Sequence, residues 1–384
     1  MDRVVVLGAG FAGLTIAKEL DALVGEGKAD VTLVERNAQF SMGFNMQWVL
    51  AGRRAPEEGE RDYASLRPRH VRLVHDEAVA IDTAERTVRT KSRLLPYEHL
   101  VVALGAELAP ELVPGLAEAA YNLCELSSML QFRSALRRFD GGTITIAVAS
   151  VPFKCPPAPY EYTMLIEDLL RERGVRERGR LVLTTPEPQP MPVAGKAVGD
   201  AVRAMLAERG IEYLPGHKPA SVDAAARIVT YENGASLTYD LLAAMPPHRA
   251  PRVVRDAGLT DVSGFVPVEL GTFRTKSPNV YAVGDSAAMK LPNGNPHPKA
   301  GVFAEAQALV LARNLAAEIQ GGEATPYAGR GVCYIDVGRG MAASAEISLL
   351  TDSGPKALID PPSAKGLELK RQFERERFTA WFGG

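Results

Sequence analysis

Three cysteines, Cys124, Cys155 and Cys333, are the residues of this chain best suited to covalent chemistry. A thiolate is a good nucleophile that can attack sulfur or an electron-poor ring. No two of them have the CxxC spacing of a zinc or iron–sulfur centre, so we expect no metal site. Scattered cysteines are most often small buried hydrophobic side chains. The segments around each cysteine must therefore decide between these roles.

Cys155 lies in a proline-rich loop, VPFKCPPAPYE, directly after a predicted buried strand at 143–150 (TITIAVAS). In a protein that binds two dinucleotides, such a strand runs into a glycine-rich turn. The three prolines that follow Cys155 fix φ and supply no backbone N–H groups. This loop therefore cannot wrap a pyrophosphate, and NAD(P)H is not expected as the electron donor.

The N-terminal segment has the glycine pattern that the cysteine loop lacks. VVVLGAGFAGLTIAKEL gives a short β-branched run, then Gly8-x-Gly10-x-x-Gly13, then a helical pattern. Such glycines let backbone N–H groups approach a pyrophosphate at the helix N-terminus. A second strand, VTLVERN, ends in Glu35, which can accept a hydrogen bond from a ribose 2′-hydroxyl and would repel a 2′-phosphate. The segment predicts a Rossmann-type dinucleotide site.

Two later segments identify the dinucleotide. YEHLVVALGA (97–106) is a predicted strand that ends in small residues, and SPNVYAVGDSA (277–287) is a strand that ends in Gly284 and Asp285. We expect Asp285 to head the helix that resumes near Val302 and to bond a ribityl hydroxyl, with helix amides facing the phosphates. Together with the N-terminal glycines, these segments resemble the FAD-binding domain of two-dinucleotide flavoproteins.

That resemblance implies an α/β fold with two Rossmann-like, glutathione-reductase-like domains and a C-terminal segment. The FAD-binding domain is expected at 1–113 and 252–315, around an inserted Rossmann-like domain at 114–251, and the segment 316–384 follows. The residues it implies for FAD binding are Gly8, Gly10, Phe11, Ala12, Gly13, Glu35, Arg36, Asn45, Val79, Ala103, Gly105, Gly284, Asp285, Lys299 and Gly301.

Three segments resemble a narrower family. KCPPAPYE (154–161), HPKAGVFAEAQA (297–308) and VCYIDVGRGMA (332–342) are similar to motifs of sulfide:quinone oxidoreductases and of the flavoprotein subunit of flavocytochrome c sulfide dehydrogenase. The resemblance implies a redox-active disulfide between Cys155 and Cys333 that hydrosulfide opens. Cys333 would face the flavin, and Cys155 would hold the sulfane sulfur.

The same resemblance assigns three further residues. Cys124, in YNLCELSSM, falls where quinone-reducing members often have a third cysteine. Glu161 matches a family carboxylate that accepts a proton, with a solvated loop glutamate as the alternative. Lys299 would stabilise the anionic reduced flavin near N1 and C2=O, with a simple helix cap as the alternative.

The electron acceptor depends on the branch of this family. In the flavocytochrome branch, a cysteine beyond the second strand usually binds FAD covalently. The corresponding stretch, ERNAQFSMGFNMQW (35–48), has no cysteine. Non-covalent FAD and a quinone acceptor are therefore expected, with sulfide or a small persulfide as the substrate. Donation to a cytochrome c and a type II NADH:quinone reductase are the alternatives.

Composition limits the remaining partners. The formal net charge of −2 gives no reason to expect nucleic acid, and no stretch approaches the roughly 20 apolar residues of a membrane span. The tail, KGLELKRQFERERFTAWFGG, combines basic residues with Phe378, Trp381 and Phe382. Such a helix suits a membrane surface, or it docks on the protein's own core or on a dimer partner. We expect a cytoplasmic protein, with peripheral attachment to the inner face of the membrane and a homodimer both open.

Overall fold

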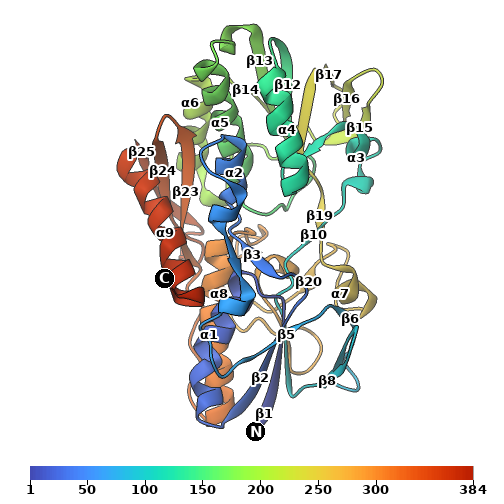
Figure 1. Ribbon diagram of the computed structural model, residues 1–384, viewed down its shortest axis with the longest axis vertical. Helices are drawn as coiled ribbons and strands as arrows, with labels where there is room; N and C mark the ends of the chain where they lie inside the picture. The colour runs from blue at the N-terminus through green and yellow to red at the C-terminus, as the bar shows by residue number, and fades with distance from the viewer. Residues whose placement is uncertain (384) are drawn as a thin grey trace.

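The computed structural model describes residues 1–383. Figure 1 shows two stacked α/β units, with the C-terminal segment of the chain packed along one side of both. The α-helices are α1 (Phe11–Gly25), α2 (Asn45–Leu50), α3 (Leu116–Ala119), α4 (Leu126–Arg138), α5 (Ala158–Glu172), α6 (Lys196–Ala207), α7 (Arg252–Asp256), α8 (Gly301–Gln320) and α9 (Ala364–Phe382). No helix within residues 1–383 has the length and apolar character needed to cross a bilayer.

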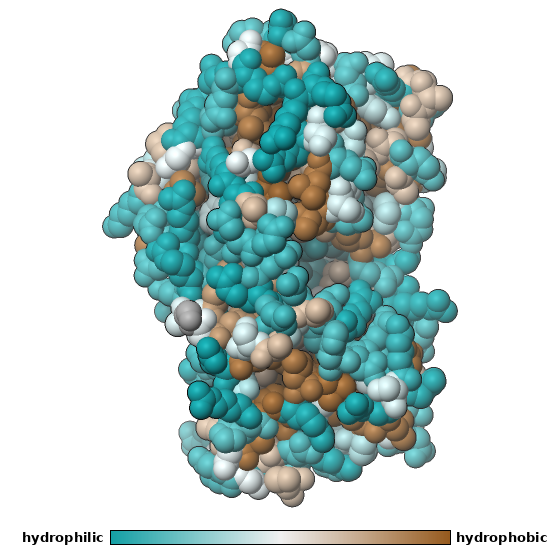
Figure 2. All heavy atoms as spheres, in the orientation of Figure 1, coloured by the Kyte–Doolittle hydropathy of each residue, from teal (hydrophilic) through white to brown (hydrophobic). Residues whose placement is uncertain are grey.

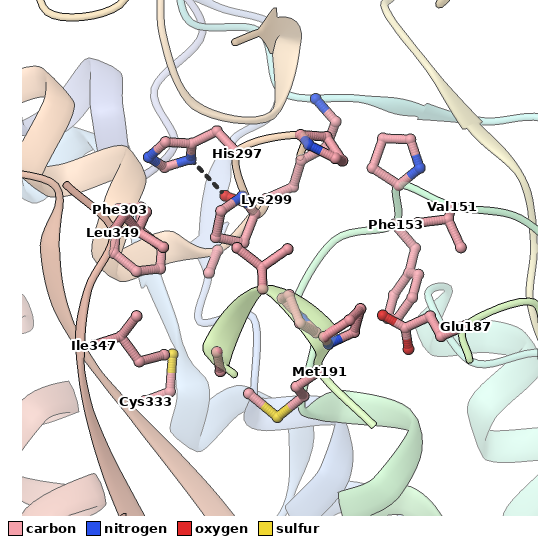
Figure 3. Close-up of a pocket in the computed structure, with 18 residues that line it drawn as sticks. Val151, Phe153, Glu187, Met191, His297, Lys299, Phe303, Cys333, Ile347 and Leu349 are labelled. Atoms are coloured by element: carbon pink, nitrogen blue, oxygen red, sulfur yellow. Dashed lines mark hydrogen bonds between the residues drawn. The ribbon is translucent and has the colours of Figure 1, made fainter. Parts of the chain in front are cut away.

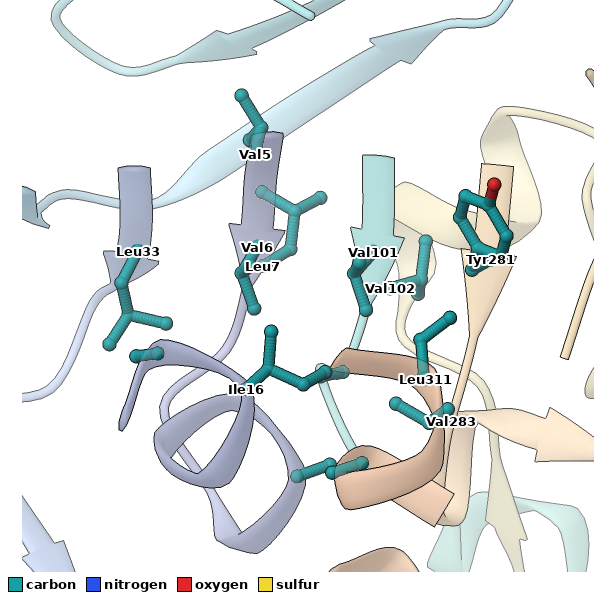
Figure 4. Packing of buried hydrophobic residues seen from close by; sticks show 14 of the residues in the cluster. Val5, Val6, Leu7, Ile16, Leu33, Val101, Val102, Tyr281, Val283 and Leu311 are labelled. Carbon is teal, nitrogen blue, oxygen red and sulfur yellow. The ribbon is translucent and has the colours of Figure 1, made fainter. Parts of the chain in front are cut away.

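The lower unit is built on a five-stranded parallel sheet in the order β21-β9-β1-β2-β5. Its strands are β1 (Asp2–Leu7), β2 (Ala29–Glu35), β5 (Arg72–His75), β9 (His99–Val102) and β21 (Val280–Ala282). Helices α1 and α8 cover one face, where Ile16 and Leu311 pack against valines and leucines of the strands (Figure 4). Strands buried in this way are nearly continuous apolar runs, as in the sequence VVVL of β1.

The upper unit repeats this architecture with a parallel sheet in the order β11-β18-β12-β13-β14. The strands are β11 (Tyr121–Asn122), β12 (Gly142–Val148), β13 (Gly179–Thr185), β14 (Glu212–Pro215) and β18 (Leu241–Met245). The unit β12–α5–β13 corresponds to β1–α1–β2 of the lower unit. Two Rossmann-like units are therefore present, which confirms the predicted fold class.

Smaller antiparallel pairs complete the two units. They are β3 (Gln39–Ser41) with β4 (Glu60–Asp62), β6 (Ala78–Asp82) with β7 (Thr87–Thr90) and β8 (Leu94–Pro96), β10 (Glu107–Leu108) with β19 (His248–Arg249), and β15 (Pro219–Asp223) with β16 (Ile228–Tyr231) and β17 (Ser236–Thr238). A short parallel pair joins β20 (Val266–Pro267) to β22 (Ala287–Ala288). The β10–β19 pair ties together the two segments that cross between the units. Figure 2 shows a mostly hydrophilic face with hydrophobic residues gathered around the recess between the units.

The C-terminal segment forms an antiparallel sheet of β23 (Arg330–Gly338), β24 (Met341–Ser348) and β25 (Lys356–Ser363), followed by α9. The aromatic end of α9 is buried: Phe378, Trp381 and Phe382 are each no more than 5% exposed. Trp381 packs edge-on against Phe11 and Phe40 of the lower unit. The membrane-surface interpretation of these aromatics is therefore wrong, and docking on the protein's own core is correct.

The segment after β21 also differs from expectation. Asp285 lies in a single 3₁₀ turn, Gly284–Ser286, and does not head a helix. Strand β22 and a loop rich in proline and asparagine separate this turn from α8, which begins at Gly301. The turn still packs on α8, because the Gly284 N–H donates to Oε1 of Gln307 at 2.8 Å.

Candidate active site between the two units

The glycine turn after β1 has the geometry that a dinucleotide requires. Gly8 has φ +93°, and a Cβ there would lie 2.6 Å from the carbonyl oxygen of Ala103. A Cβ on Gly13 would lie 1.8 Å from the carbonyl oxygen of Gly8, so α1 can pack this closely only through glycine. Around Gly10 and Gly105, by contrast, a Cβ would meet nothing within 4 Å. The turn is thus closely packed on its inner side and open on its outer side.

Glu35 ends β2 beside this turn. Its Oε2 accepts a hydrogen bond from the N–H of Ala9 at 2.8 Å, and its Oε1 accepts from the N–H and Nδ2 of Asn37 at 2.8 and 2.7 Å. These bonds fix the carboxylate at the carboxyl end of the sheet, where the crevice of a doubly wound fold binds its ligand. The open glycines and the fixed carboxylate fit the adenosine and pyrophosphate parts of FAD.

Other predicted FAD-binding residues lie in varied surroundings. Ala12 and Ala103 are buried around the glycine turn. Arg36 is exposed and pairs with Glu77 at 3.2 Å, and Val79 is 39% exposed on β6. The buried side chain of Asn45 donates to the carbonyl oxygen of Pro56 and accepts from Arg54. A role in binding FAD stays a prediction for all five.

A cavity of about 200 Å³ lies between the two units and the C-terminal segment. It brings together all four residues predicted for catalysis and four of those predicted for FAD binding. These eight are Cys124, Cys155, Glu161 and Cys333 together with Phe11, Asp285, Lys299 and Gly301. Residues that are far apart in the sequence thus line one space.

Cys155 has a strained backbone in the loop just before α5 begins. Its φ is +58°, in the left-handed region that residues other than glycine seldom adopt. The Cys155 N–H donates to the carbonyl oxygen of Lys299 at 2.7 Å, and its own carbonyl accepts from the N–H of Ala158 at 2.8 Å. Such conformations persist where the surroundings over-determine them, and they cluster at functional sites. The loop therefore holds the sulfur in a defined place, and the N–H groups of Cys155 and Ala158 are both occupied within the protein.

Cys333 approaches from the other side because β23 packs against α5. Within residues 1–383 all three cysteines are free thiols, so the predicted disulfide is not formed in this structure. Burial, together with the nearby charge of Glu161, raises the pKa of Cys333 to about 12, and Lys370 opposes the shift. Burial also raises the pKa of Cys155, with the same two charges acting on it. Both sulfurs are therefore protonated thiols in the free protein, and a negative charge on sulfur at this site has to come from an anionic substrate.

Cys124 lines the same cavity. It is buried, with its sulfur 3.8 Å from Sδ of Met245. Burial raises the pKa of the Cys124 thiol, and the positive charge of Lys154 partly offsets this. The position places a third thiol on the wall of the cavity that Cys155 and Cys333 also line.

Glu161 is a buried carboxylate, so the alternative of a solvated loop residue is wrong. Its side chain is 1% exposed and forms an ion pair with Lys370 of α9, which is 2% exposed. The N–H of Asp336 donates to Glu161 Oε1 at 2.7 Å, and Nε2 of Gln47 donates to Oε2 at 3.0 Å. Burial raises the pKa of Glu161 despite the opposing charge of Lys370. For Lys370, burial opposes the charge, but Glu161 and Asp336 outweigh it and raise its pKa.

Lys370 and Gln47 are site residues that sequence reasoning missed. Lys370 is one of several basic residues in the tail, yet it follows Leu367 and precedes Phe373 at three-residue spacing, on the buried stripe of α9. A lysine on the apolar face of a helix is a signal that could have been found. Gln47, at the buried face of the short helix α2, carries no comparable signal.

Lys299 is buried and does not cap α8. Its Nζ donates to the carbonyl oxygens of Asp285 and Ala287, both at 2.8 Å, and lies 3.6 Å from the ring centre of Phe265. Burial lowers the pKa of Lys299 to about 8, against the opposing charge of Asp285. The helix-cap alternative is therefore wrong. The ammonium binds the Asp285 turn, and the backbone carbonyl of Lys299 accepts from the N–H of Cys155 in the cysteine loop.

A second, smaller cavity of about 50 Å³ reaches the wall formed by Cys333. Figure 3 shows Cys333, Ile347 and Leu349 on one side and Phe153 and Glu187 on the other. The wall of this cavity is almost wholly apolar, and the one carboxylate that residues 1–383 contribute to it is that of Glu187.

Glu187 follows β13 as Glu35 ends β2, so it occupies the position of a ribose-binding acid in the upper unit. In this protein a buried side chain binds that carboxylate: the hydroxyl of Tyr160, a fully buried residue of α5, donates a hydrogen bond to Glu187 Oε2 at 2.8 Å. The second glycine turn is replaced by prolines, and the acid is bound by a side chain. Both changes oppose dinucleotide binding in the upper unit.

Glu187 predicts a pH dependence of stability. Burial raises its pKa from 4.5 to about 7, with hydrogen bonds from Tyr160 and Thr185 opposing. A carboxyl whose folded pKa is raised stabilises the fold fully below pH 4.5 and loses that contribution as the pH rises through 7. Glu187→Gln should therefore stabilise the protein by up to about 3 kcal/mol at pH 8 and have little effect at pH 4.5. Urea unfolding at both pH values measures this.

The matched control for this experiment is Glu346→Gln, at an exposed position on β24. It should change the unfolding midpoint little at either pH. An equal effect of Glu187→Gln at pH 4.5 and pH 8 would contradict the assignment of the buried charge.

Comparison with known proteins places this geometry in a family. Residues 2–308 match the pyridine nucleotide-disulphide oxidoreductase family. The mitochondrial sulfide:quinone oxidoreductase of Dictyostelium discoideum is 27% identical over 334 residues, covering 82% of this chain and 70% of the relative. The sulfide-quinone reductase of Aquifex aeolicus is 25% identical over 358 residues, covering 88% and 81%.

A solved structure shows the same fold. The X-ray structure of the sulfide:quinone oxidoreductase from Aquifex aeolicus aligns with a TM-score of 0.88 at 22% identity, covering 99% of this chain and 91% of that one. The resemblance drawn from the cysteine motifs is thus confirmed, and the family implies a flavin cofactor. The chain belongs to the pyridine nucleotide-disulphide oxidoreductase family and is an FAD-dependent oxidoreductase.

Proposed function

We propose that this protein is a sulfide:quinone oxidoreductase. It oxidises hydrogen sulfide to sulfane sulfur through Cys155 and Cys333, and it passes two electrons through non-covalent FAD to a quinone. The observation that carries the proposal is the single cavity lined by both cysteines, Glu161 and the predicted FAD-binding residues. The relatives named for sulfide and quinone support the same pair of reactants. Covalent attachment of FAD by a cysteine has no candidate near 35–48.

Bound FAD would supply a two-electron acceptor that can return its electrons to a second substrate. Gly8, Gly10 and Glu35 would hold its adenosine and pyrophosphate parts. The Asp285 turn, fixed by Lys299, and the start of α8 at Gly301 would hold the part that reaches the cavity. Each of these residues acts by binding and orienting the cofactor.

The cysteines supply the sulfur chemistry. Hydrosulfide attacks a Cys155–Cys333 disulfide, its sulfur bonds to Cys155, and the bond between the two cysteines breaks. Cys155 then carries a persulfide and Cys333 a thiolate, which holds the electron pair released from the broken bond. Since burial disfavours either thiolate in the free protein, a disulfide that is attacked by an anion suits this site better than a standing thiolate. The disulfide forms again once the sulfane sulfur has left Cys155, and the electron pair released in this step is the one that the quinone gains with two protons. Overall, sulfide loses two electrons and the quinone gains two.

Glu161 is the proton acceptor in this proposal. Burial raises its pKa, which favours uptake of a proton, and Lys370 keeps the carboxyl in the cavity wall. A proton from the substrate sulfur would bind there and be available when the quinone is reduced. Cys124, on the same wall, would accept sulfane sulfur from Cys155 by thiol exchange.

Anaerobic titration of the purified holoenzyme tests the proposal. Sulfide should bleach the oxidised-flavin absorbance within one turnover, and adding a short-chain quinone should restore it. NADH should not bleach it, because the upper unit has prolines at the turn and Tyr160 on its acid. Bleaching by NADH together with none by sulfide would favour the type II NADH:quinone reductase instead.

Acid precipitation separates the proposal from the cytochrome c alternative. Non-covalent FAD should remain in the supernatant when the protein is precipitated. Yellow flavin in the pellet, with cytochrome c reduced faster than quinone, would favour the flavocytochrome branch.

A further inference from the structure

Gln47 makes one hydrogen bond from an amide that could make several. The side chain is 1% exposed and lines the larger cavity. Its Nε2 donates to Glu161 Oε2 at 3.0 Å, whereas its Oε1 has no hydrogen-bond partner in residues 1–383 and is shielded from solvent. A buried acceptor without a partner is unfavourable, so its retention beside a reacting carboxyl calls for a reason.

Glu161 distributes its contacts unevenly between its two oxygens. Oε1 receives Lys370 and the N–H of Asp336, and Oε2 receives only Gln47. Oε1 is therefore the oxygen that keeps its charge partners, and Oε2 is the oxygen free to take a proton. Once protonated, Oε2 becomes a donor, and Nε2 of Gln47, which can only donate, offers no acceptor to the new O–H group.

A glutamine amide can serve both states of such an oxygen. Half a turn about its last side-chain bond exchanges Nε2 and Oε1, which changes the group facing Glu161 from donor to acceptor. Because Oε1 has no other partner, no second hydrogen bond has to break. The protonation state of Glu161 alone then sets the orientation of the amide.

We propose that Gln47 is a positioning residue whose side-chain amide rotates when Glu161 takes up a proton, so that one residue holds both the ionised and the protonated carboxyl. The proposal rests on the role of Glu161 as proton acceptor given above. In that step a sulfur–hydrogen bond of the substrate breaks, the electron pair stays on sulfur, and an oxygen–hydrogen bond forms at Oε2. The amide rotation keeps the protonated carboxyl from swinging away from the cavity.

Other groups around Glu161 cannot take over this role. Lys370 on α9 can only donate, and Asp336 on β23 presents a backbone N–H that can only donate. The charge of Glu161 raises the pKa of the Cys155 and Cys333 thiols, and the hydroxyl of Tyr162, on the same helix, donates to the carbonyl oxygen of Leu123.

Infrared difference spectroscopy of the holoenzyme, without sulfide or quinone, tests the proposal during a pH titration. Glu161→Gln identifies the C=O band of the protonated carboxyl by removing it. In Gln47→Met this band should move to the higher frequency of an acid that lacks an acceptor. The same variant should slow flavin bleaching by sulfide about tenfold, the effect of losing one hydrogen bond to a charged group.

If Gln47 acts only as a donor, Gln47→Met leaves the band in place and raises the titration midpoint by about 1–2 pH units. That result would overturn the proposal. Gln47→Asn, which keeps a shorter amide, should shift the band in the same direction by less, and it serves if the Met variant does not fold. Gln39→Met, at an exposed position on β3, is the surface control. Since no substrate is present, a protein that fails to oxidise sulfide can still pass or fail this test.

Discussion

Cys155→Ser and Cys333→Ser should each lower sulfide-dependent quinone reduction by about 10³-fold or more while leaving FAD bound. A serine hydroxyl cannot form a disulfide or a persulfide, so hydrosulfide meets no sulfur–sulfur bond to attack. Replacing a residue that forms the covalent intermediate closes this reaction route entirely, so the rate falls much further than it would if only substrate binding were weakened. Stopped-flow absorbance gives the rate of flavin bleaching, and the flavin-to-protein absorbance ratio confirms that the cofactor is retained.

Cys124→Ser is the matched comparison, since Cys124 is a third thiol on the same cavity wall. It should slow repeated turnovers, because sulfane sulfur would leave Cys155 more slowly, while a single turnover bleaches the flavin at nearly the wild-type rate. If Cys124→Ser loses the fast bleaching phase and keeps its flavin, the pair of reacting sulfurs has been assigned incorrectly. Full activity in Cys333→Ser would remove the cysteine mechanism altogether.

The parts of the fold that sequence predicts are those in which neighbours in the chain determine the structure. The run from Val4 through Gly13 to Glu35 predicts strand, turn, helix and strand, and β1, α1 and β2 follow in that order. Local periodicity and the glycine spacing carry this information. The proline loop after β12 is predicted for the same reason, because proline acts on its own backbone.

The site is less predictable because its contacts are distant in the sequence. Glu161 could be matched to a family carboxylate, but its burial depends on Lys370 from the last helix and on Gln47 from a helix near the N-terminus. The tail illustrates the same limit: its basic and aromatic residues suit a membrane surface, and only tertiary packing against Phe11 and Phe40 shows that Trp381 is internal. Composition alone cannot distinguish these two surroundings.

Lys370→Met should destabilise the protein by about 3–5 kcal/mol, since it leaves the carboxylate of Glu161 buried without its cation. The loss should come from the uncompensated charge, because methionine fills a similar volume on the apolar face of α9. Adding Glu161→Gln to Lys370→Met removes that charge and should recover about half of the loss or more. Urea unfolding at pH 7.5 of the two single variants and the double variant gives the coupling between the residues.

Lys365→Met, at an exposed position on the same helix, should stay within about 0.5 kcal/mol of the wild type. Equal losses in the double variant and in Lys370→Met would mean that Lys370 stabilises α9 by packing and that its charge does not hold Glu161 in the cavity wall.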